Sequence, residues 1–534
     1  MKSAIIIGGG FGGLTTGALL AREGMDVTVI EKNHHIGGGL QSFRRDGIDF
    51  ETGMHILGGF NEGDTVYRIF DYIGILDRLR LKRSDTDCMD QITYLSPTPA
   101  PTTTPASAVP ATTPASATPA TTPADSSAGS ITYRIPQGRA AFTEALCRYF
   151  PAESDGIAAY VEALYQMADE VDFFNLRPTD NFFKVHSDRF MQPVDEFIAG
   201  FVSDPRLQDL LAYMNPMYGG VRHQTPAYIH ALINVLYIKG QFHFIGRSQH
   251  MAEELARVIT EHGGRVISGD AVTAVEVEDK RATAVVTAQG KRFTADYVIN
   301  TLHPQQLFDL LPEGALSKAY ITRLSEAPLT YSAFILYIVF KPESFPYINH
   351  TCYLQDDYGL VWSHGDYDDA TWPRGMMYIT PPTEDQGPWA QRMTVNCIMP
   401  WAQVAQWADT RVGHRGADYE AWKRRLAERI IDKMEKLYPG FRDKVQTYIA
   451  ASPLTIRDYY GSPCGALYGY QKDAHDPART MVMPVTKIPN LLLSGQCVNL
   501  HGICGVPLTA INTAEVIFGT NTIINKINAH AAHS

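Results

Sequence analysis

Residues 4–32, AIIIGGGFGGLTTGALLAREGMDVTVIEK, decide the fold of the N-terminal part of this chain. Residues 4–7 form a continuous apolar run typical of a buried strand, and glycines at positions 8, 10 and 13 follow it with G-x-G-x-x-G spacing. Such glycines allow a tight turn, close approach of the backbone to a pyrophosphate, and close packing of the next helix on the strand. We therefore predict a strand, a glycine turn and a helix over residues 14–22 that ends at Gly24.

A second strand follows over residues 27–30 and ends at Glu31. An acidic side chain at this position can accept hydrogen bonds from both hydroxyls of an adenosine ribose, and it would repel the 2′-phosphate of NADP. The strand–turn–helix–strand order with a terminal acid predicts a Rossmann-like, dinucleotide-binding α/β domain. The alternative is a glycine-rich turn in another kind of α/β protein.

A second glycine cluster distinguishes between dinucleotides. Residues 34–60 read HHIGGGLQSFRRDGIDFETGMHILGGF and place Gly37, Gly38 and Gly39 shortly after Glu31. Glycines here let the chain wrap the far side of an extended cofactor, which a plain NAD dehydrogenase does not need. The cluster therefore favours FAD over NAD.

These stretches carry a family resemblance. GGGFGGL, the acid at position 31, IGGGLQSF and GIDFETGMH resemble the N-terminus of the FAD-dependent phytoene desaturase, carotenoid isomerase and retinol saturase family, within the flavoproteins that have two dinucleotide-binding domains. The resemblance implies bound FAD. It implies cofactor contacts from Gly8, Gly10, Gly12, Gly13, Glu31, Lys32, Gly38, Gly39, Leu40 and His55.

The resemblance extends to the middle and the end of the chain. Residues 255–304 are expected to form a helix, a glycine turn and a β-meander. The resemblance implies that the backbone of Val272 meets the adenine of the cofactor. The alternative is that Val272 lies at an ordinary sheet edge. NLLLSGQCVNLHGICGVPLTAINTAEVIFG at 490–519 is expected to form a strand, a loop and a helix from about Pro507. In the family this unit closes over the flavin, which implies contacts from Gly495, Gly502, Gly505 and Val506. Its loop lies closer to the saturase and isomerase side of the family.

The domain organisation follows from these segments. We predict an FAD-binding domain built from residues 1–70, 241–303 and 484–534, and an α+β substrate domain built from 71–240 and 304–483. A Thr/Pro-rich insert at 97–130 contains the run PTTTPASAVPATTPASATPATTPADSS. Such sequence buries too little apolar surface to offset its ordering entropy, so we predict disorder there. Both flanks resemble strands, which predicts that the insert is the tip of a hairpin.

The function implied by the resemblance is oxidation or reduction of a C–C double bond in an apolar polyene or isoprenoid lipid, as a saturase or a desaturase, by hydride transfer at the flavin. A proton must also move. Candidates for that role are His501 first, then His55, Arg457 and Tyr468. For each of them a structural or cofactor contact is the more common role of such a residue. Alternatives are a redox-neutral polyene isomerase that uses reduced FAD, an amine or porphyrinogen oxidase of the same fold, and a non-catalytic binding protein.

Composition excludes other classes. The net charge is −11 and no basic block stands out, so nucleic acid is not expected as a partner. Seven scattered cysteines without a CxxC pair argue against a zinc site or a disulfide framework and fit a reducing compartment. No apolar run reaches the roughly 20 residues that span a bilayer. We expect a cytoplasmic enzyme that acts on an apolar small molecule. If it contacts a membrane, we expect a peripheral contact at the inner face, made by apolar side chains. No feature of the sequence identifies an electron partner or an oligomeric state.

Overall fold

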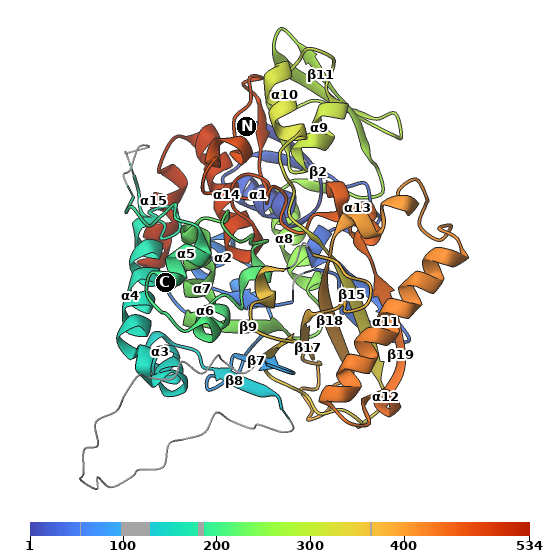
Figure 1. The fold of residues 1–534 in the computed structure, drawn as a ribbon. Helices are drawn as coiled ribbons and strands as arrows, with labels where there is room; N and C mark the ends of the chain where they lie inside the picture. The colour runs from blue at the N-terminus through green and yellow to red at the C-terminus, as the bar shows by residue number, and fades with distance from the viewer. Residues whose placement is uncertain (54, 98–128, 180–185, 364–365, 534) are drawn as a thin grey trace, which may run out of the picture.

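The computed structural model describes residues 1–53, 55–97, 129–179, 186–363 and 366–533. A five-stranded parallel sheet lies near both termini (Figure 1) and has the order β10-β2-β1-β14-β20. Helix α1 packs against both α8 and α14 beside it. The bounds are β10 (Arg265–Ile267), β2 (Asp26–Ile30), β1 (Ser3–Ile7), β14 (Tyr297–Asn300), β20 (Leu491–Leu493), α1 (Phe11–Arg22), α8 (Gln249–Glu261) and α14 (Gly502–Phe518).

The N-terminal unit forms as the sequence predicts, with one difference. β1 is buried, α1 follows directly, and β2 pairs with β1 from Ser3↔Asp26 to Ile7↔Ile30. Helix α1 begins at Phe11, three residues before the predicted start, because Gly12 and Gly13 belong to its first turn rather than to the loop. The Rossmann-like fold is confirmed.

The predicted β-meander is also confirmed. Strands β11 (Val272–Glu278), β12 (Arg281–Thr287) and β13 (Arg292–Phe293) form an antiparallel three-stranded sheet. The chain then returns through β14 to a place between β1 and β20 in the parallel sheet. One sheet thus combines strands from the beginning, the middle and the end of the chain.

A larger mixed sheet of seven strands forms the second layer. Its order is β19-β15-β18-β17-β16-β7-β8, antiparallel throughout except for the parallel pair β16 and β7. The bounds are β19 (Val445–Ala451), β15 (Ser332–Phe340), β18 (Arg392–Met399), β17 (Gly375–Ile379), β16 (Thr351–Gln355), β7 (Asp90–Tyr94) and β8 (Ile131–Ile135).

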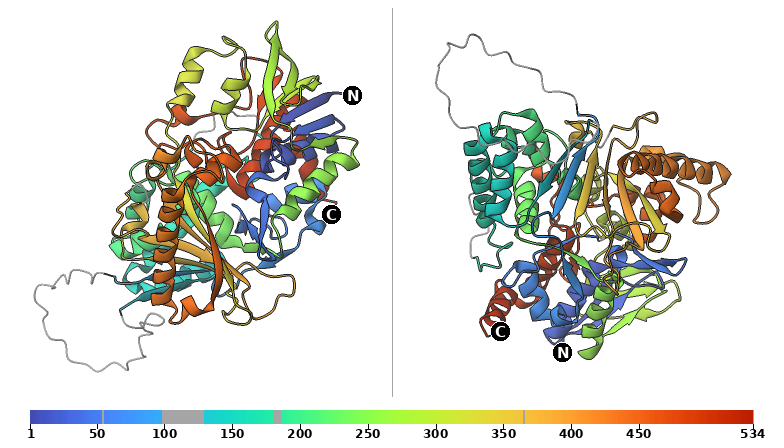
Figure 2. Two further views of the ribbon diagram at one scale, coloured as in Figure 1. Left: turned by 90° about the vertical axis from the view of Figure 1, so that its right-hand side faces the viewer. Right: turned by 90° about the horizontal axis from the view of Figure 1, so that it is seen from below.

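The two faces of this sheet have different neighbours (Figure 2). Alternate side chains of a strand point to opposite faces. Leu336 and Ile338 of β15 pack in one core with Leu426 and Ile430 of α11 (Ala417–Leu437), whereas Ala333 and Ile335 face the other way. That other face looks toward a group of helices that includes α3 (Arg139–Tyr149), α4 (Ser154–Glu170) and α7 (Ala227–Lys239).

The strands that flank the Thr/Pro-rich insert pair with each other. β7 and β8 are antiparallel neighbours from Asp90↔Ile135 to Tyr94↔Ile131, which confirms the predicted hairpin. The predicted disorder of residues 97–130 falls on residues 98–128, which lie outside the described residues.

Smaller elements complete the described chain. The short strands are β3 (Ser42–Arg45), β4 (Ile48–Glu51), β5 (Leu57–Gly58), β6 (Leu81–Arg83) and β9 (Gln241–Phe244). The remaining helices are α2 (Thr65–Ile73), α5 (Val194–Ala199), α6 (Pro205–Leu211), α9 (Pro304–Leu310), α10 (Lys318–Ser325), α12 (Phe441–Lys444), α13 (Pro453–Tyr460) and α15 (Thr522–Ala531). In the described part of the chain no single helix has the length and apolarity to cross a membrane; α14 and α15 reach that threshold only as a pair, bent by 119°.

Candidate active site

The glycine turn between β1 and α1 relies on contacts that only glycine allows. Gly8 has a φ of +103°, and a Cβ on Gly13 would lie 1.9 Å from the carbonyl oxygen of Gly8. Gly10 is the N-cap of α1, and Gly10 and Gly12 line a cavity at the start of this helix. Unpaired N–H groups and the dipole at a helix N-terminus favour phosphate oxygens. The turn can therefore hold the pyrophosphate of a dinucleotide.

Glu31 stands at the end of β2 and orders the same turn. One carboxylate oxygen accepts a hydrogen bond from the Gly9 N–H at 2.7 Å, and the other accepts one from the Asn33 N–H at 2.8 Å. A carboxylate has about four acceptor positions, so two remain for further donors. Glu31 can thus fix the turn and also accept hydrogen bonds from ribose hydroxyls.

Six residues predicted as cofactor contacts do not line the cavity: Gly8, Gly13 and Glu31, which form or order the glycine turn, and Lys32, Leu40 and Val272, which do not. The Nζ of Lys32 donates to the carbonyl oxygen of Asp458 at 3.2 Å. Leu40 is fully buried in the core, and Val272 is the first residue of β11. The contacts of Lys32, Leu40 and Val272 with the cofactor stay predictions.

The second glycine cluster lies against the first. The Gly37 N–H donates to the Gly9 carbonyl oxygen at 2.7 Å, and a Cβ on Gly38 would lie 3.0 Å from the Cα of Gly10. A Cβ on Gly39 would have no described protein atom within 4 Å. Gly38 and Gly39 both line the cavity, and Gly39 leaves open space there.

The strand, loop and helix at the C-terminus close the cavity from the other side. A Cβ on Gly12 would lie 2.8 Å from the Cα of Gly495. The first turn of α1 is therefore in close contact with the loop that follows β20. Gly502, Gly505 and Val506 line the cavity at the start of α14.

The predicted start of α14 at Pro507 is wrong. The helix begins at Gly502, with His501 as its N-cap, and Pro507 is already inside it. The two glycines of the first turn suggested a loop, but a Cβ on Gly505 would lie 2.8 Å from the carbonyl carbon of Leu500. Close packing of the loop on the helix therefore requires glycine within this helical turn, and that packing outweighs its low helix propensity.

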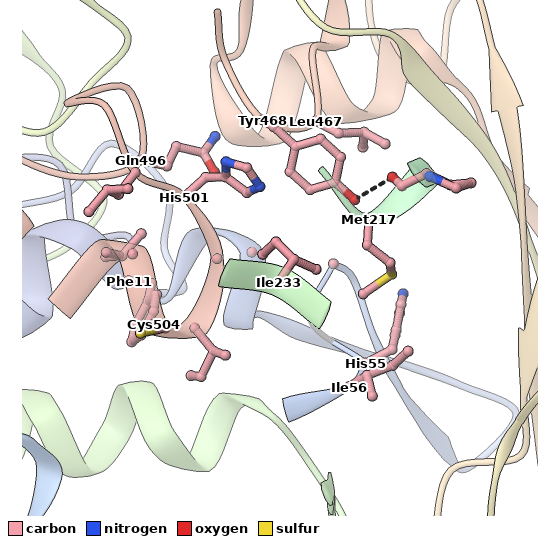
Figure 3. Close-up of a pocket in the computed structure, with 18 of the residues that line it drawn as sticks. Phe11, His55, Ile56, Met217, Ile233, Leu467, Tyr468, Gln496, His501 and Cys504 are labelled. Atoms are coloured by element: carbon pink, nitrogen blue, oxygen red, sulfur yellow. Dashed lines mark hydrogen bonds between the residues drawn. The ribbon is translucent and has the colours of Figure 1, made fainter. Parts of the chain in front are cut away.

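One cavity of about 360 Å³ connects these glycine segments with the seven-stranded sheet and α7 (Figure 3). Pockets of this size hold small organic ligands. Its walls are mostly apolar. Outside the glycine segments, the apolar lining residues include Val171, Phe174, Met217, Ile229, Leu232, Ile233, Leu236, Ala333, Ile335, Ile398, Ile456 and Leu467.

The predicted catalytic residues divide into two groups. Arg457 does not line the cavity; its guanidinium donates to the carbonyl oxygen of Ala408 at 2.7 Å and to the Asp458 carboxylate at 2.8 Å, which are structural contacts. Tyr468 lines the cavity, but its hydroxyl donates to the carbonyl oxygen of Pro216 at 3.0 Å. The hydroxyl proton of Tyr468 is therefore already engaged.

His55 and His501 line the cavity at separate places (Figure 3). Among the residues that the structure describes, both ring nitrogens of His55 and the Nε2 of His501 are buried without a hydrogen-bond partner. The ring of His501 lies 4.7 Å from that of Tyr468. Burial lowers the pKa of each imidazole to about 4, with His243 adding to the effect at His55 and Lys472 adding to it at His501. Both side chains are neutral at pH 7 and offer unpaired nitrogens to a ligand.

Sequence reasoning missed the polar groups on the sheet side of the cavity. Gln355 at the end of β16 and Asn396 in β18 line it together with Tyr353 and Met377. Only the strict alternation of the strands places them on this face, and the sequence does not say which strands are neighbours.

Comparisons with known proteins agree with this architecture. Residues 6–73 match the model of the NAD(P)-binding Rossmann-like domain. All-trans-retinol 13,14-reductase of Rattus norvegicus is 26% identical over 97% of this chain and 86% of the relative. Prolycopene isomerase 1 of an Oncidium hybrid cultivar is 23% identical over 96% of this chain and 83% of the relative. The crystal structure of an oxidoreductase from Methanosarcina mazei shares the fold, with a TM-score of 0.60 and 15% identity, over 96% of this chain and 100% of that one.

A Rossmann-like sheet joined through one cavity to a mixed-sheet region defines a dinucleotide-binding fold, and the full-length relatives place it in the class of oxidoreductases. The full-length matches narrow this class. Over nearly its full length the chain is similar to members of the phytoene desaturase, carotenoid isomerase and retinol saturase family.

Proposed function

We propose that this protein is an FAD-dependent oxidoreductase that adds or removes hydrogen across a C–C double bond of a polyene or isoprenoid lipid. One observation carries the proposal: a single, mostly apolar cavity runs from the glycine turn of α1 and the N-terminus of α14 to the sheet and to α7. A long apolar ligand and a dinucleotide would therefore meet within one cavity.

The residues present fit FAD. Gly10, Gly12 and Gly39 leave a cradle that a Cβ would narrow or fill, and two helix N-termini face it. α1 would hold the pyrophosphate and Glu31 the ribose, whereas the start of α14 would favour negative charge on the ring system. When bound, FAD supplies hydride transfer at its N5 position.

The chain's own residues do the remaining work. The apolar walls of α7 and the sheet exclude water and hold the lipid beside the ring. His501 is our first candidate to hold or move the proton, since its Nε2 is unpaired in the cavity, and His55 is the second. A neutral imidazole carries one N–H and one lone pair, so it can take part in either direction of the reaction.

The family includes isomerases, and a redox-neutral isomerase is the second candidate. An amine oxidase is disfavoured, because no described residue that lines the cavity carries a carboxylate for a substrate ammonium.

The test is an anaerobic half-reaction. Purified protein with its flavin reduced is mixed with all-trans-retinol or a carotenoid, and the absorbance of oxidised flavin is followed. Return of that absorbance with a gain of two hydrogens in the lipid supports a saturase. A rearranged lipid without net flavin oxidation identifies an isomerase. If no flavin co-purifies or binds, the proposal fails.

A further inference from the structure

The cavity-facing side of the seven-stranded sheet carries two amide side chains. Gln355 of β16 pairs with Gly375 of β17, and Asn396 of β18 pairs with Met377 of the same strand. Gly375 and Met377 are two residues apart and so share one face. Gln355 and Asn396 therefore flank β17 on the face that lines the cavity.

Gln355 is buried but makes no side-chain hydrogen bond within the described structure. It is only 5% exposed, and its Oε1 is a buried atom without a partner. Gly375 makes room for this amide, because a Cβ there would lie 2.6 Å from the Gln355 Oε1. Burying an unpaired amide costs stability, so a group held in this way indicates a ligand that pairs with it.

The surroundings limit what that ligand can be. None of the described residues that line the cavity is Asp, Glu, Lys or Arg, and the two histidines there are neutral. A buried carboxylate or ammonium would find no opposite charge, which makes its transfer from water costly. A hydroxyl, in contrast, needs only hydrogen-bond partners such as an amide provides.

We propose that Gln355, with Asn396 as a second polar group on the same sheet face, selects lipids whose apolar chain ends in an uncharged hydrogen-bonding group such as a hydroxyl. This inference rests on the proposed function. The hydrocarbon would lie along Ile229, Leu232 and Ile233 of α7, while the head group meets the sheet. Bare hydrocarbons would leave the amide unpaired, and carboxylic acids or amines would bring an unpaired charge.

The test measures equilibrium binding to the full-length, FAD-loaded protein, by quenching of its tryptophan fluorescence. The probes are all-trans-retinol, the same polyene without its hydroxyl, and retinoic acid. We expect the alcohol to bind about tenfold more tightly than either of the others, the effect of one satisfied buried hydrogen bond. Gln355→Leu should abolish this preference, and Asn396→Leu should reduce it.

Gln446→Leu is the matched control, because it makes the same change on an exposed position of β19 in the same sheet. Gly375→Ala is a second route that keeps the amide but displaces it; it should also weaken the preference for the alcohol. It decides the question if Gln355→Leu does not fold.

The outcomes separate the two proposals. A preference for the alcohol that survives in Gln355→Leu and in Gly375→Ala overturns the role of Gln355. Equal binding of all three probes to the wild type overturns head-group selection but leaves the polyene function standing. Binding of none of them overturns both.

Discussion

His501 has the position and the chemistry that proton exchange with a lipid in the cavity would require. Its Nε2 is unpaired in the cavity and the residue caps α14. We predict that His501→Ala slows the flavin half-reaction about 100-fold while FAD stays bound, because general acid–base groups contribute about 10²–10⁴-fold. Stopped-flow absorbance measures the rate, and flavin content measures binding.

His55→Ala is the comparison variant, and His533→Ala at the exposed C-terminus is the control. An unchanged half-reaction in His501→Ala would remove the assignment. If only His55→Ala slows the half-reaction, the proton-transfer role belongs to His55 instead.

Gly39 tests where the cofactor lies. A Cβ there projects into open cavity, and the residue does not have a positive φ, so alanine strains nothing in the protein. We predict that Gly39→Ala keeps the melting temperature of the cofactor-free protein but lowers FAD affinity about tenfold, since the methyl group enters space the cofactor needs. Titration with FAD and thermal unfolding measure the two effects.

Gly13→Ala is the contrasting variant, since its Cβ would lie 1.9 Å from the Gly8 carbonyl oxygen. It should lower the stability of the protein itself. Full FAD affinity in Gly39→Ala would place the cofactor elsewhere.

At the scale of elements, the β7–β8 hairpin makes the insert dispensable. Tyr94 and Ile131 face each other at the open end of the paired strands. Deleting residues 98–128 leaves residues 95–97 and 129–130 as a loop of five, a common hairpin length. We predict normal FAD content and equal or higher stability, because a shorter loop closes at a cost lower by about 1–2 kcal/mol. Chemical denaturation of the deletion variant checks this, and loss of FAD binding would contradict it.

The elements that could be predicted from sequence are those with local causes. The β1–α1–β2 unit and the β11–β13 meander follow from glycine turns and from runs of apolar or alternating residues. The start of α14 could not be predicted from the sequence, because its glycines are required by tertiary packing against Leu500. The position of Gln355 in the cavity wall could not be predicted for the same reason. It depends on β16 lying between β17 and β7, and β7 is about 260 residues away in the chain.

At the scale of the whole molecule, several buried imidazoles make stability depend on pH. Burial lowers their pKa values to about 4, or about 3 for His230, against about 6.5 in the unfolded chain. The unfolded chain therefore binds protons that the fold excludes, and stability that is full above about pH 6.5 is lost as the pH falls toward 4. The residues are His55, His230, His243, His303 and His501.

Asp90 and Asp209 act in the opposite direction. Burial raises the pKa of each to about 6, so the fold retains protons that the unfolded chain releases above about pH 4. Five histidines outweigh two aspartates, and we predict a lower melting temperature at about pH 5 than at about pH 7.5, with each histidine contributing on the order of 1 kcal/mol. Calorimetry of the FAD-loaded protein at a series of pH values checks this prediction. A melting temperature that stays constant or rises as the pH falls would contradict it.

The parallel sheet joins β1, which starts at Ser3, to its last strand β20, which starts at Leu491. During synthesis the ribosome therefore releases the whole stretch of chain between Ser3 and Leu491 before this sheet can be completed. The contact of Gly12 with Gly495 must wait equally long. We therefore expect cofactor loading to be a late event in the life of the polypeptide, and a product truncated before Leu491 to lack part of its dinucleotide site.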